Sequence, residues 1–328
     1  GFASITPADV DNGSFDNCGI ASLAIDQSDF DCTSLGSVFV TLIVTDVNGN
    51  VSTCVSDITV RDTVSPEVDC TPLVVQLDSL GVATITPEQV ELASSDNCEV
   101  QGLSLDEDTF DCSNIGTNTV TLTVTDVNGN TNSCSATVIV EENVPPVALC
   151  QDVTVYLDNQ GEVAISAQQI DAGSTDNCLI DTIYVTPNEF TCSGFGENPV
   201  VLTVEDAYGN VSDCSAIVTV VDTINPIAVC QDITVQLDSL GNAAIVAEEI
   251  DNGSNDACGI LGFTADITTF DCSNVGLNTV TLTVEDNNGN TSTCTVEVSI
   301  EDNVPPMASC IDLTVNLDGN GTVNISSG

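Results

Sequence analysis

Basic side chains are almost absent from this sequence, and their absence excludes whole classes of function. Among 328 residues Arg61 is the single Lys or Arg, and histidine and tryptophan do not occur. Nucleic-acid binding needs cations that displace counterions from phosphate, and anionic membrane surfaces attract basic clusters. Without histidine or lysine, most general-base, Schiff-base and Ser–His or Cys–His mechanisms are unavailable. We therefore expect no enzyme.

Acidic residues are abundant instead. Fifty Asp and Glu residues give a formal net charge of −49, while hydrophobic residues make up 42% of the chain. High charge predicts disorder only when hydrophobicity is low, so we expect a folded chain. A folded chain this acidic repels itself unless it binds cations. Oxygen ligands suit hard ions, and the expected cofactor is structural Ca²⁺.

The sixteen cysteines recur with a period of 80 residues, because adding 80 to any of the first twelve positions gives another cysteine. A fixed internal period is typical of a repeat array, and a unit of this length is the size of a domain. The predicted domains are a partial repeat at 1–65, full repeats at 66–145, 146–225 and 226–305, and the start of another at 306–328.

An even number of cysteines, without a CxxC pair or histidine, indicates disulfides rather than zinc. Disulfides predict an extracellular or cell-surface location. No signal peptide and no apolar run of 18 residues is present, so no membrane insertion is expected. We interpret the chain as a window on a longer polymer of repeats. The alternative is that residues 306–328 of a neighbouring chain complete the first repeat by strand donation.

Each repeat is predicted to be an Ig-like β-sandwich. In the second repeat Val120, Leu122 and Val124 alternate with threonines, the turn at Asn128-Gly129 follows, and a second alternating run begins at Cys134. Alternation around Asn-Gly is a strong hairpin signal. Several short strands in about 80 residues, with no helical periodicity, predict an all-β tandem array of Ig-like domains.

Four cysteines per repeat allow three pairings, and sequence alone leaves them open. We favour one long-range bridge, Cys70–Cys134, and one local bridge, Cys98–Cys112, although the last two could lie at opposite ends of the sandwich. A rival that joins Cys54 to Cys70 and Cys134 to Cys150 is disfavoured, because extended strand residues would have to fold back. The predicted disulfide cysteines are Cys18 with Cys32, Cys70 with Cys134, Cys98 with Cys112, Cys150 with Cys214, Cys178 with Cys192, Cys230 with Cys294, and Cys258 with Cys272.

A family resemblance rests on three segments: the Thr119–Cys134 hairpin, the Asp96-Asn97-Cys98 loop, and the linker from Glu142 to Pro146. Together they resemble the hyalin repeat type of Ig-like domain. The Phe110-Asp111-Cys112 version resembles repeats of large surface adhesins and gliding-type proteins of Bacteroidota. The resemblance covers the whole chain and implies an extracellular, cohesive or adhesive role without enzymatic activity. The chain is more acidic and more regular than many related repeats.

Acidic loops are expected to meet where one repeat joins the next. In an Ig-like sandwich the first strand begins at the end that carries the B–C and F–G loops. The arrangement resembles the calcium-stiffened linkers of cadherins, and carboxylate and amide oxygens are Ca²⁺ ligands. The alternative for each residue is a turn or a solvated charge. The candidate metal ligands are Asp62, Asp96, Asn97, Asp126, Asn128 and Asn130; Glu141, Glu142, Asn143, Asp176, Asn177, Asp206 and Asn210; Asp222, Asp256, Asp286, Asn288 and Asn290; and Glu301 with Asp302.

These observations predict a structural segment of a long extracellular fibre or adhesin stalk. Disulfides would close each repeat and Ca²⁺ would stiffen the junctions, while further copies of the same repeat would be the partners. The alternative is an adhesin that binds a glycan or a surface ligand. The third repeat is the candidate for that function, because it carries Tyr156, Tyr184, Phe195 and Tyr208.

Overall fold

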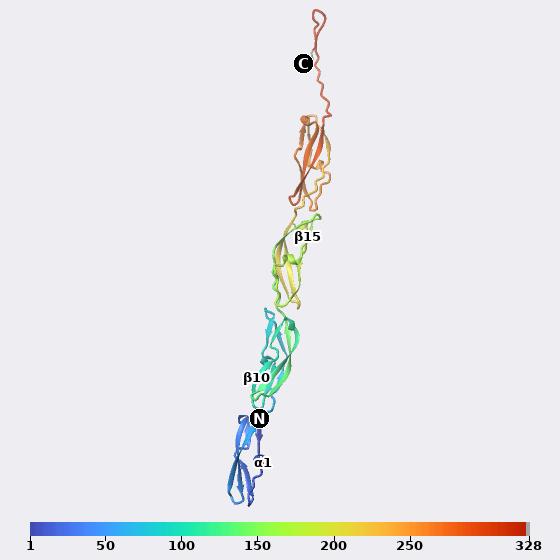
Figure 1. Cartoon of the computed structure of the whole chain (residues 1–328). Helices are drawn as coiled ribbons and strands as arrows, with labels where there is room; N and C mark the ends of the chain where they lie inside the picture. The colour runs from blue at the N-terminus through green and yellow to red at the C-terminus, as the bar shows by residue number, and fades with distance from the viewer. Residues whose placement is uncertain (326–328) are drawn as a thin grey trace. The chain divides into compact units, whose positions relative to one another are not determined.

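The computed structural model describes residues 1–325 as a series of β-sandwich repeats (Figure 1). The chain divides into two compact units, and the division runs through the third repeat. One unit comprises 1–149, 171–184 and 203–214, and the other comprises 150–170, 185–202 and 215–328. The first two junctions between repeats therefore lie within the first unit and the third junction lies within the second. The all-β tandem fold predicted from the sequence is confirmed.

The second repeat shows the full arrangement of strands. Its elements are β6 (Glu67–Cys70), β7 (Leu73–Gln76), β8 (Val82–Thr84), α2 (Pro87–Val90), β9 (Glu91–Ser95), β10 (Val100–Leu105), β11 (Thr109–Asp111), the 3-10 turn η2 (Cys112–Asn114), β12 (Gly116–Asp126) and β13 (Thr131–Glu141). One sheet has the order β10-β12-β13-β7, in which β7 runs parallel to β13 and the other neighbours are antiparallel. The pairs β8–β11 and β6–β9 form the opposite layer.

The core of this repeat lies between the two layers. Val120, Leu122 and Val138 are fully buried, together with Phe110 from β11 and Val90 from α2. Period-2 alternation places one face of β12 and β13 inward, and the intervening threonines face outward. The hairpin register Val120↔Ala136 and Leu122↔Cys134 follows from the turn at 126–130.

The single helical turn α2 has no helical periodicity in the sequence that would predict it. Its sequence Thr86-Pro87-Glu88-Gln89 is a capping box with proline at the first helical position, and Thr86 N donates to Gln89 Oε1 at 2.7 Å. Such a box stabilises one turn without needing a helical period, because it satisfies the free N–H groups locally. The turn places Val90, its buried residue, in the core.

The other repeats contain corresponding elements in the same phase, but among the described residues none has strands equivalent to β6 and β9, and the fourth has a 3-10 turn in place of α2. In the first they are β1 (Phe2–Ser4), α1 (Pro7–Val10), β2 (Ile20–Ile25), β3 (Asp29–Asp31), η1 (Cys32–Ser34), β4 (Gly36–Asp46) and β5 (Val51–Val60). In the third they are β14 (Val153–Tyr156), β15 (Glu162–Ala164), α3 (Ala167–Ile170), β16 (Ile180–Thr186), β17 (Glu189–Thr191), η3 (Cys192–Gly194), β18 (Gly196–Asp206) and β19 (Val211–Val221). In the fourth they are β20 (Ile233–Gln236), β21 (Asn242–Ala244), η4 (Ala247–Glu249), β22 (Ile260–Ala265), β23 (Thr269–Asp271), η5 (Cys272–Asn274), β24 (Gly276–Asp286) and β25 (Thr291–Glu301).

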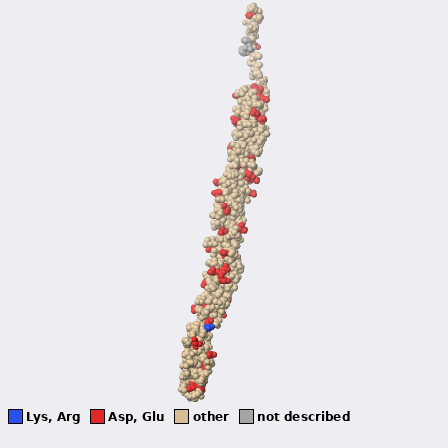
Figure 2. Space-filling view, viewed as in Figure 1, with Lys and Arg blue, Asp and Glu red and all other residues tan. Residues whose placement is uncertain are grey.

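The fourth repeat reproduces the sheet of the second in the order β20-β25-β24-β22, whereas the sheet of the first repeat has three strands, β2-β4-β5. Residues 306–325 form no strand and are exposed. Within the described residues, no helix has the length and apolar character needed to cross a bilayer. Carboxylates lie along the visible surface with almost no basic side chain to offset them (Figure 2).

Candidate cation sites at the junctions between repeats

Three disulfides join consecutive repeats across their junctions. They are Cys32–Cys98, Cys112–Cys178 and Cys192–Cys258, and each spans 66 residues. The local pairing predicted from the sequence, Cys98 with Cys112 and its copies, is therefore wrong. The long-range bridge within a repeat is the one favoured from sequence, because Cys70 is bonded to Cys134 and Cys230 to Cys294. Cys150 and Cys214, which share this spacing of 64, are also disulfide-bonded.

The direction of β10 explains why the local pairing fails. β10 carries the chain away from Cys98, and at about 3.3 Å per residue its six residues span about 20 Å. β11 does not bring the chain back, because it pairs with β8 in the other layer. Cys98 and Cys112 therefore lie at opposite ends of their repeat, and each bonds to a neighbouring repeat.

Cys18 and Cys272, predicted in local bridges, are free and exposed, as are Cys54 and Cys310. Cys18 has the phase of Cys98, whose partner lies 66 residues earlier. Cys272 has the phase of Cys112, whose partner lies 66 residues later. Both partner positions fall outside the 328 residues of this chain.

A glycine next to each junction disulfide makes room for it. Gly81 has φ +73°, and a Cβ there would lie 2.7 Å from Asn177 O and 2.9 Å from Cys112 Sγ. At Gly161 the corresponding Cβ would lie 2.5 Å from Cys192 Sγ. Glycine is the residue that tolerates both this backbone conformation and this close approach. The glycines in phase at 81 and 161 were visible in the sequence, but their link to a bridge between repeats was not.

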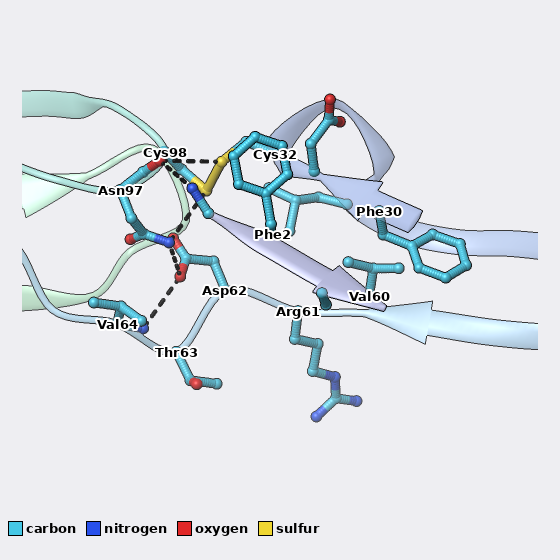
Figure 3. A pocket seen from close by; sticks show the side chains of 14 residues that line it. Phe2, Phe30, Cys32, Val60, Arg61, Asp62, Thr63, Val64, Asn97 and Cys98 are labelled. Atoms are coloured by element: carbon cyan, nitrogen blue, oxygen red, sulfur yellow. Dashed lines mark hydrogen bonds between the residues drawn. A yellow bond between two sulfur atoms is a disulfide. The ribbon is translucent and has the colours of Figure 1, made fainter. Parts of the chain in front are cut away.

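At the first junction Asp62 and Asn97, from two different repeats, lie beside the Cys32–Cys98 bridge (Figure 3). Asp62 comes from the linker that follows β5, and its Oδ1 accepts from Val64 N at 3.1 Å. The Asn97 amide lies between two carboxylates: one end is 3.3 Å from Asp62 Oδ1, and the other is 3.1 Å from Asp96 Oδ2. Asp62 Oδ2 is buried and has no hydrogen-bond partner.

At the second junction the linker residue is Glu142, whose side chain is 5% exposed. Its Oε1 accepts from Val144 N at 2.7 Å, and its Oε2 accepts from Asn210 Nδ2 at 2.6 Å. The same Asn210 amide donates to Asp206 Oδ2 at 2.7 Å, so it bridges two buried carboxylates. Asp176 Oδ1 and Asn177 Oδ1 are buried without a partner.

Burial also shapes the charge of this second cluster. Burial raises the pKa of Glu142 above its usual range, and the neighbouring Asp206 adds to the rise while the Val144 N–H opposes it. Burial acts in the same direction on Asp206, but hydrogen bonds from Asn210 and from the Tyr208 N–H outweigh it and lower the pKa. The cluster therefore holds negative charge that its own hydrogen bonds only partly stabilise.

At the third junction Asp222 is the linker residue and is 5% exposed. Its Oδ1 accepts from Ile224 N at 3.0 Å, while its Oδ2 is buried without a partner. Asn288 Oδ1 is also buried without a partner. Asp256 belongs to the next repeat, and its Oδ1 accepts from Cys258 N at 2.7 Å. Carboxylate oxygens of Asp222 and Asp256, one from each side of the junction, lie within 4.8 Å of each other.

Several predicted ligands have other roles. Asp126 is fully buried, and its two oxygens accept from Asn128 N, Asn130 N and Asn130 Nδ2 at 2.7–2.8 Å, so it stabilises its own hairpin turn. Asp206 and Asp286 do the same in their repeats. Asn130 and Asn290 donate to the linker carbonyls of Asp62 and Asp222 at 3.4 Å, so these amides link the turn to the linker.

Glu141 and Glu301, which directly precede the linker residues Glu142 and Asp302, are hydrogen-bonded within their own repeats. Glu141 Oε2 accepts from Gln76 Nε2 at 2.6 Å, and Asn143 Nδ2 donates to Gln76 Oε1 at 2.6 Å. Glu301 is held by Gln236 in the same way. Asp302 is exposed, and its Oδ1 accepts from Val304 N at 3.0 Å. Glu141, Asn143 and Glu301 are therefore held within their own repeats, whereas Asp302 has the phase of the linker residues Asp62, Glu142 and Asp222.

The unpartnered oxygens coincide with the junctions. Among the residues that the structure describes, five buried side-chain oxygens lack hydrogen-bond partners: Asp62 Oδ2, Asp176 Oδ1, Asn177 Oδ1, Asp222 Oδ2 and Asn288 Oδ1. All five belong to the predicted ligand set. Buried carboxylate oxygens without a donor are costly unless a cation compensates them.

The distances at two junctions are compatible with one ion. Carboxylate oxygens of Asp62 and Asp96 lie within 4.8 Å of one another, and so do those of Asp222 and Asp256. Two oxygens on opposite sides of one Ca²⁺ lie about 5 Å apart. The sulfurs of Cys98 and Cys258 lie in the same groups, but they are bonded in disulfides and supply no thiolate.

Comparison with known proteins gives no assignment for the chain. No family model matches. An uncharacterized 81.3 kDa protein of Acholeplasma phage L2 is 25% identical over 239 residues, which cover 69% of this chain and 31% of that protein, so the chain spans about a third of its length. Among similar solved structures, protocadherin γB7 EC3–6 is 16% identical, with 83% of this chain and 86% of that chain covered and a TM-score of 0.31. Titin domains I67–I69 are 11% identical, with 72% of this chain and 98% of that chain covered and a TM-score of 0.31. The human desmocollin-1 ectodomain is 13% identical, with 84% of this chain and 69% of that chain covered and a TM-score of 0.27.

Proposed function

We propose that the chain is a structural segment of an extracellular stalk or fibre, in which each repeat is joined to the next both by a linker and by a disulfide. The observation that carries the proposal is the recurrence of one bridge, with the same spacing, at each of the three junctions between the four sandwiches that the structure describes. A chain that only displays independent binding modules does not need covalent bonds between them. Disulfides at this density are typical of oxidising, extracellular surroundings.

Calcium is the proposed cofactor of the junctions. Asp62, Asp96 and the Asn97 amide would hold it at the first junction, and Glu142, Asp176 and Asn177 would do so at the second. Asp222, Asp256 and Asn288 form the third set. A bound Ca²⁺ supplies positive charge and draws oxygens of two repeats to one point. The chain's own residues hold the two sides of each site in place. The Asn130 and Asn290 amides bond to the linker carbonyls, and the junction disulfide holds the loop that precedes its second cysteine.

Further copies of the same repeat are the proposed partners. The parallel partner of Val138–Glu141 in the second repeat is β7, whereas the equivalent edge of β5 has no such strand among the described residues. Residues 313–316 have the sequence phase of β7 and are exposed. Free Cys54 and free Cys310 have the phases of the bonded pair Cys134 and Cys70.

A ligand-binding adhesin is the alternative, and a catalytic role is not proposed. Tyr156, Tyr184, Phe195 and Tyr208 are 44–60% exposed, but none of them lines the three described cavities. The acidic residues recur in every repeat, whereas an active site is normally built once. Glycan binding lost with the four aromatic side chains would favour the adhesin.

The stalk proposal is tested by small-angle X-ray scattering and thermal unfolding of the oxidised chain, first with millimolar calcium and then with excess chelator. We expect an elongated particle that becomes more variable in shape with chelator, and a melting temperature that rises with calcium. An elongated profile and a melting temperature that are both unchanged by chelator would remove calcium from the proposal. A compact profile in both conditions would overturn the stalk.

A further inference from the structure

The two kinds of disulfide divide the covalent structure of the chain into two routes. The junction bridges join Cys32 to Cys98, Cys112 to Cys178 and Cys192 to Cys258. Each interior repeat has one cysteine bonded to the preceding repeat and one bonded to the following repeat. These two cysteines are 14 residues apart, as Cys98 and Cys112 are. A continuous covalent route therefore runs through the second repeat along β10 and β11, and through the third along β16 and β17.

This route is much shorter than the backbone. From Cys32 to Cys258 the backbone takes 226 residue steps, whereas the route through three disulfides takes 28. At about 3.4 Å per extended residue, the backbone could reach roughly 770 Å. With Cα–Cα distances of 5.2–5.5 Å across the bridges, the disulfide route could reach only about 110 Å.

We propose that tension along the chain passes through the junction disulfides and the segments 98–112 and 178–192, which limits the extension of the protein even when its sandwiches unfold. The inference rests on the proposed stalk function and adds a mechanical property to it. The linkers at 142–146 and 222–226 lie in the bypassed loops, so they carry no tension at full extension. The junction cations would then set the stiffness of the folded chain, and the disulfides would set its maximum length.

The Cys70–Cys134 bridge has a different role in this arrangement. It links β6 to β13, and neither residue lies on the short route between Cys32 and Cys258. Removing it should make the sandwich easier to unfold without lengthening the fully stretched chain. This bridge therefore provides a matched control, because it is a disulfide of nearly the same spacing, 64 residues against 66, in the same repeat.

Single-molecule force spectroscopy on the full chain, held by handles at its two ends, tests the proposal. The background replaces the four free cysteines by serine, and mass spectrometry verifies the remaining bridges. Reduction should lengthen the stretched chain by about 200 residues, or roughly 70 nm. The double variant Cys112→Ser with Cys178→Ser should lengthen the oxidised chain by at least about 13 nm. The control Cys70→Ser with Cys134→Ser should leave its stretched length unchanged.

Three results would overturn the proposal: an oxidised chain that reaches the length of the reduced chain, no lengthening in the Cys112–Cys178 variant, or lengthening in the Cys70–Cys134 control. The stretched length does not depend on how stable the variants are, so a variant that folds poorly still reports on the route. The measurement is also independent of calcium. A limited extension without calcium binding would retain the mechanical inference and contradict only the proposed cofactor.

Discussion

Gly81 approaches Cys112 so closely that a side chain on the glycine would collide with the junction bridge: a Cβ would lie 2.9 Å from Cys112 Sγ. The same Cβ would lie 2.7 Å from the carbonyl oxygen of Asn177 in the next repeat. One glycine thus contacts both halves of a junction, and its phase is repeated at Gly161. The turn at 78–81, closed by the hydrogen bond from Gly81 N to Asp78 O, therefore also forms one side of the junction.

Gly81→Ala should weaken the second junction. The substitution strains a positive φ and also pushes a methyl group into Cys112 Sγ and Asn177 O, at a cost of about 1–3 kcal/mol. Gly129→Ala is the matched control, because Gly129 has φ +87° and nothing within 4 Å of its Cβ. We expect a larger drop in melting temperature, and faster reduction of Cys112–Cys178, for Gly81→Ala. Equal effects of the two variants would show that the close approach does not matter.

Cleaving the second linker should not separate the chain. A protease site placed at 143–146 lies between Cys112 and Cys178, and their bond crosses the cut. The cleaved protein should run as one band on a non-reducing gel and as two bands after reduction. The variant Cys112→Ser with Cys178→Ser should give two bands in both lanes. Two bands from the cleaved wild type without reductant would contradict the junction bridge.

Asp222→Asn should have opposite effects with and without calcium. In chelator the substitution removes a buried, partly unpartnered charge, so the melting temperature should stay the same or rise. In calcium it removes a ligand, and the affinity of the third junction should fall by about tenfold or more. Asp238→Asn, in a turn whose Asp238 Oδ1 accepts from Leu240 N and Asn242 N, serves as control and should leave calcium affinity unchanged in calorimetry. A loss of stability in both conditions would argue against the cation site.

Asp106 gives a pH dependence with a defined sign. Its Oδ1 accepts from Thr121 N at 2.7 Å, and this hydrogen bond lowers the pKa of the carboxyl below its ordinary value of 3.8. A lowered pKa in the folded state means that the carboxylate stabilises the fold above the ordinary value, and that this contribution is lost as pH falls through the folded pKa. Asp106→Asn should therefore lower the melting temperature at pH 7, and the difference from wild type should shrink below pH 3.8. A difference that is constant from pH 7 to pH 2 would contradict this assignment.

The sheet could be predicted from sequence because its signals are local. The alternation of Val120, Leu122 and Val124 and the Asn128-Gly129 turn define the β12–β13 hairpin without reference to distant residues. Cys70–Cys134 could be favoured for a related reason, since it joins two neighbouring strands. The period of 80 residues, however, cannot distinguish a bond within a repeat from one to the next repeat. That choice depends on the end of the sandwich at which β10 begins.

The candidate site could be predicted as a region but not as a ligand set. The position shared by Asp62, Glu142 and Asp222 was selected from sequence, and the structure buries the last two of these residues. Asp126 and Glu141 have the same chemistry, yet hydrogen bonds occupy their oxygens. Which oxygen remains without a donor depends on turn geometry and on a neighbouring glutamine, Gln76, that lies 65 residues from Glu141 in sequence.

The constant separation of 66 residues between bridge partners has a genetic consequence. Unequal recombination between two repeats adds or removes whole units of 80 residues, and it leaves every surviving cysteine at the same distance from a partner. An inserted unit supplies one cysteine for the bridge to the preceding repeat and one for the bridge to the following repeat. The number of units can therefore change from one gene copy to another without creating an interior thiol that lacks a mate.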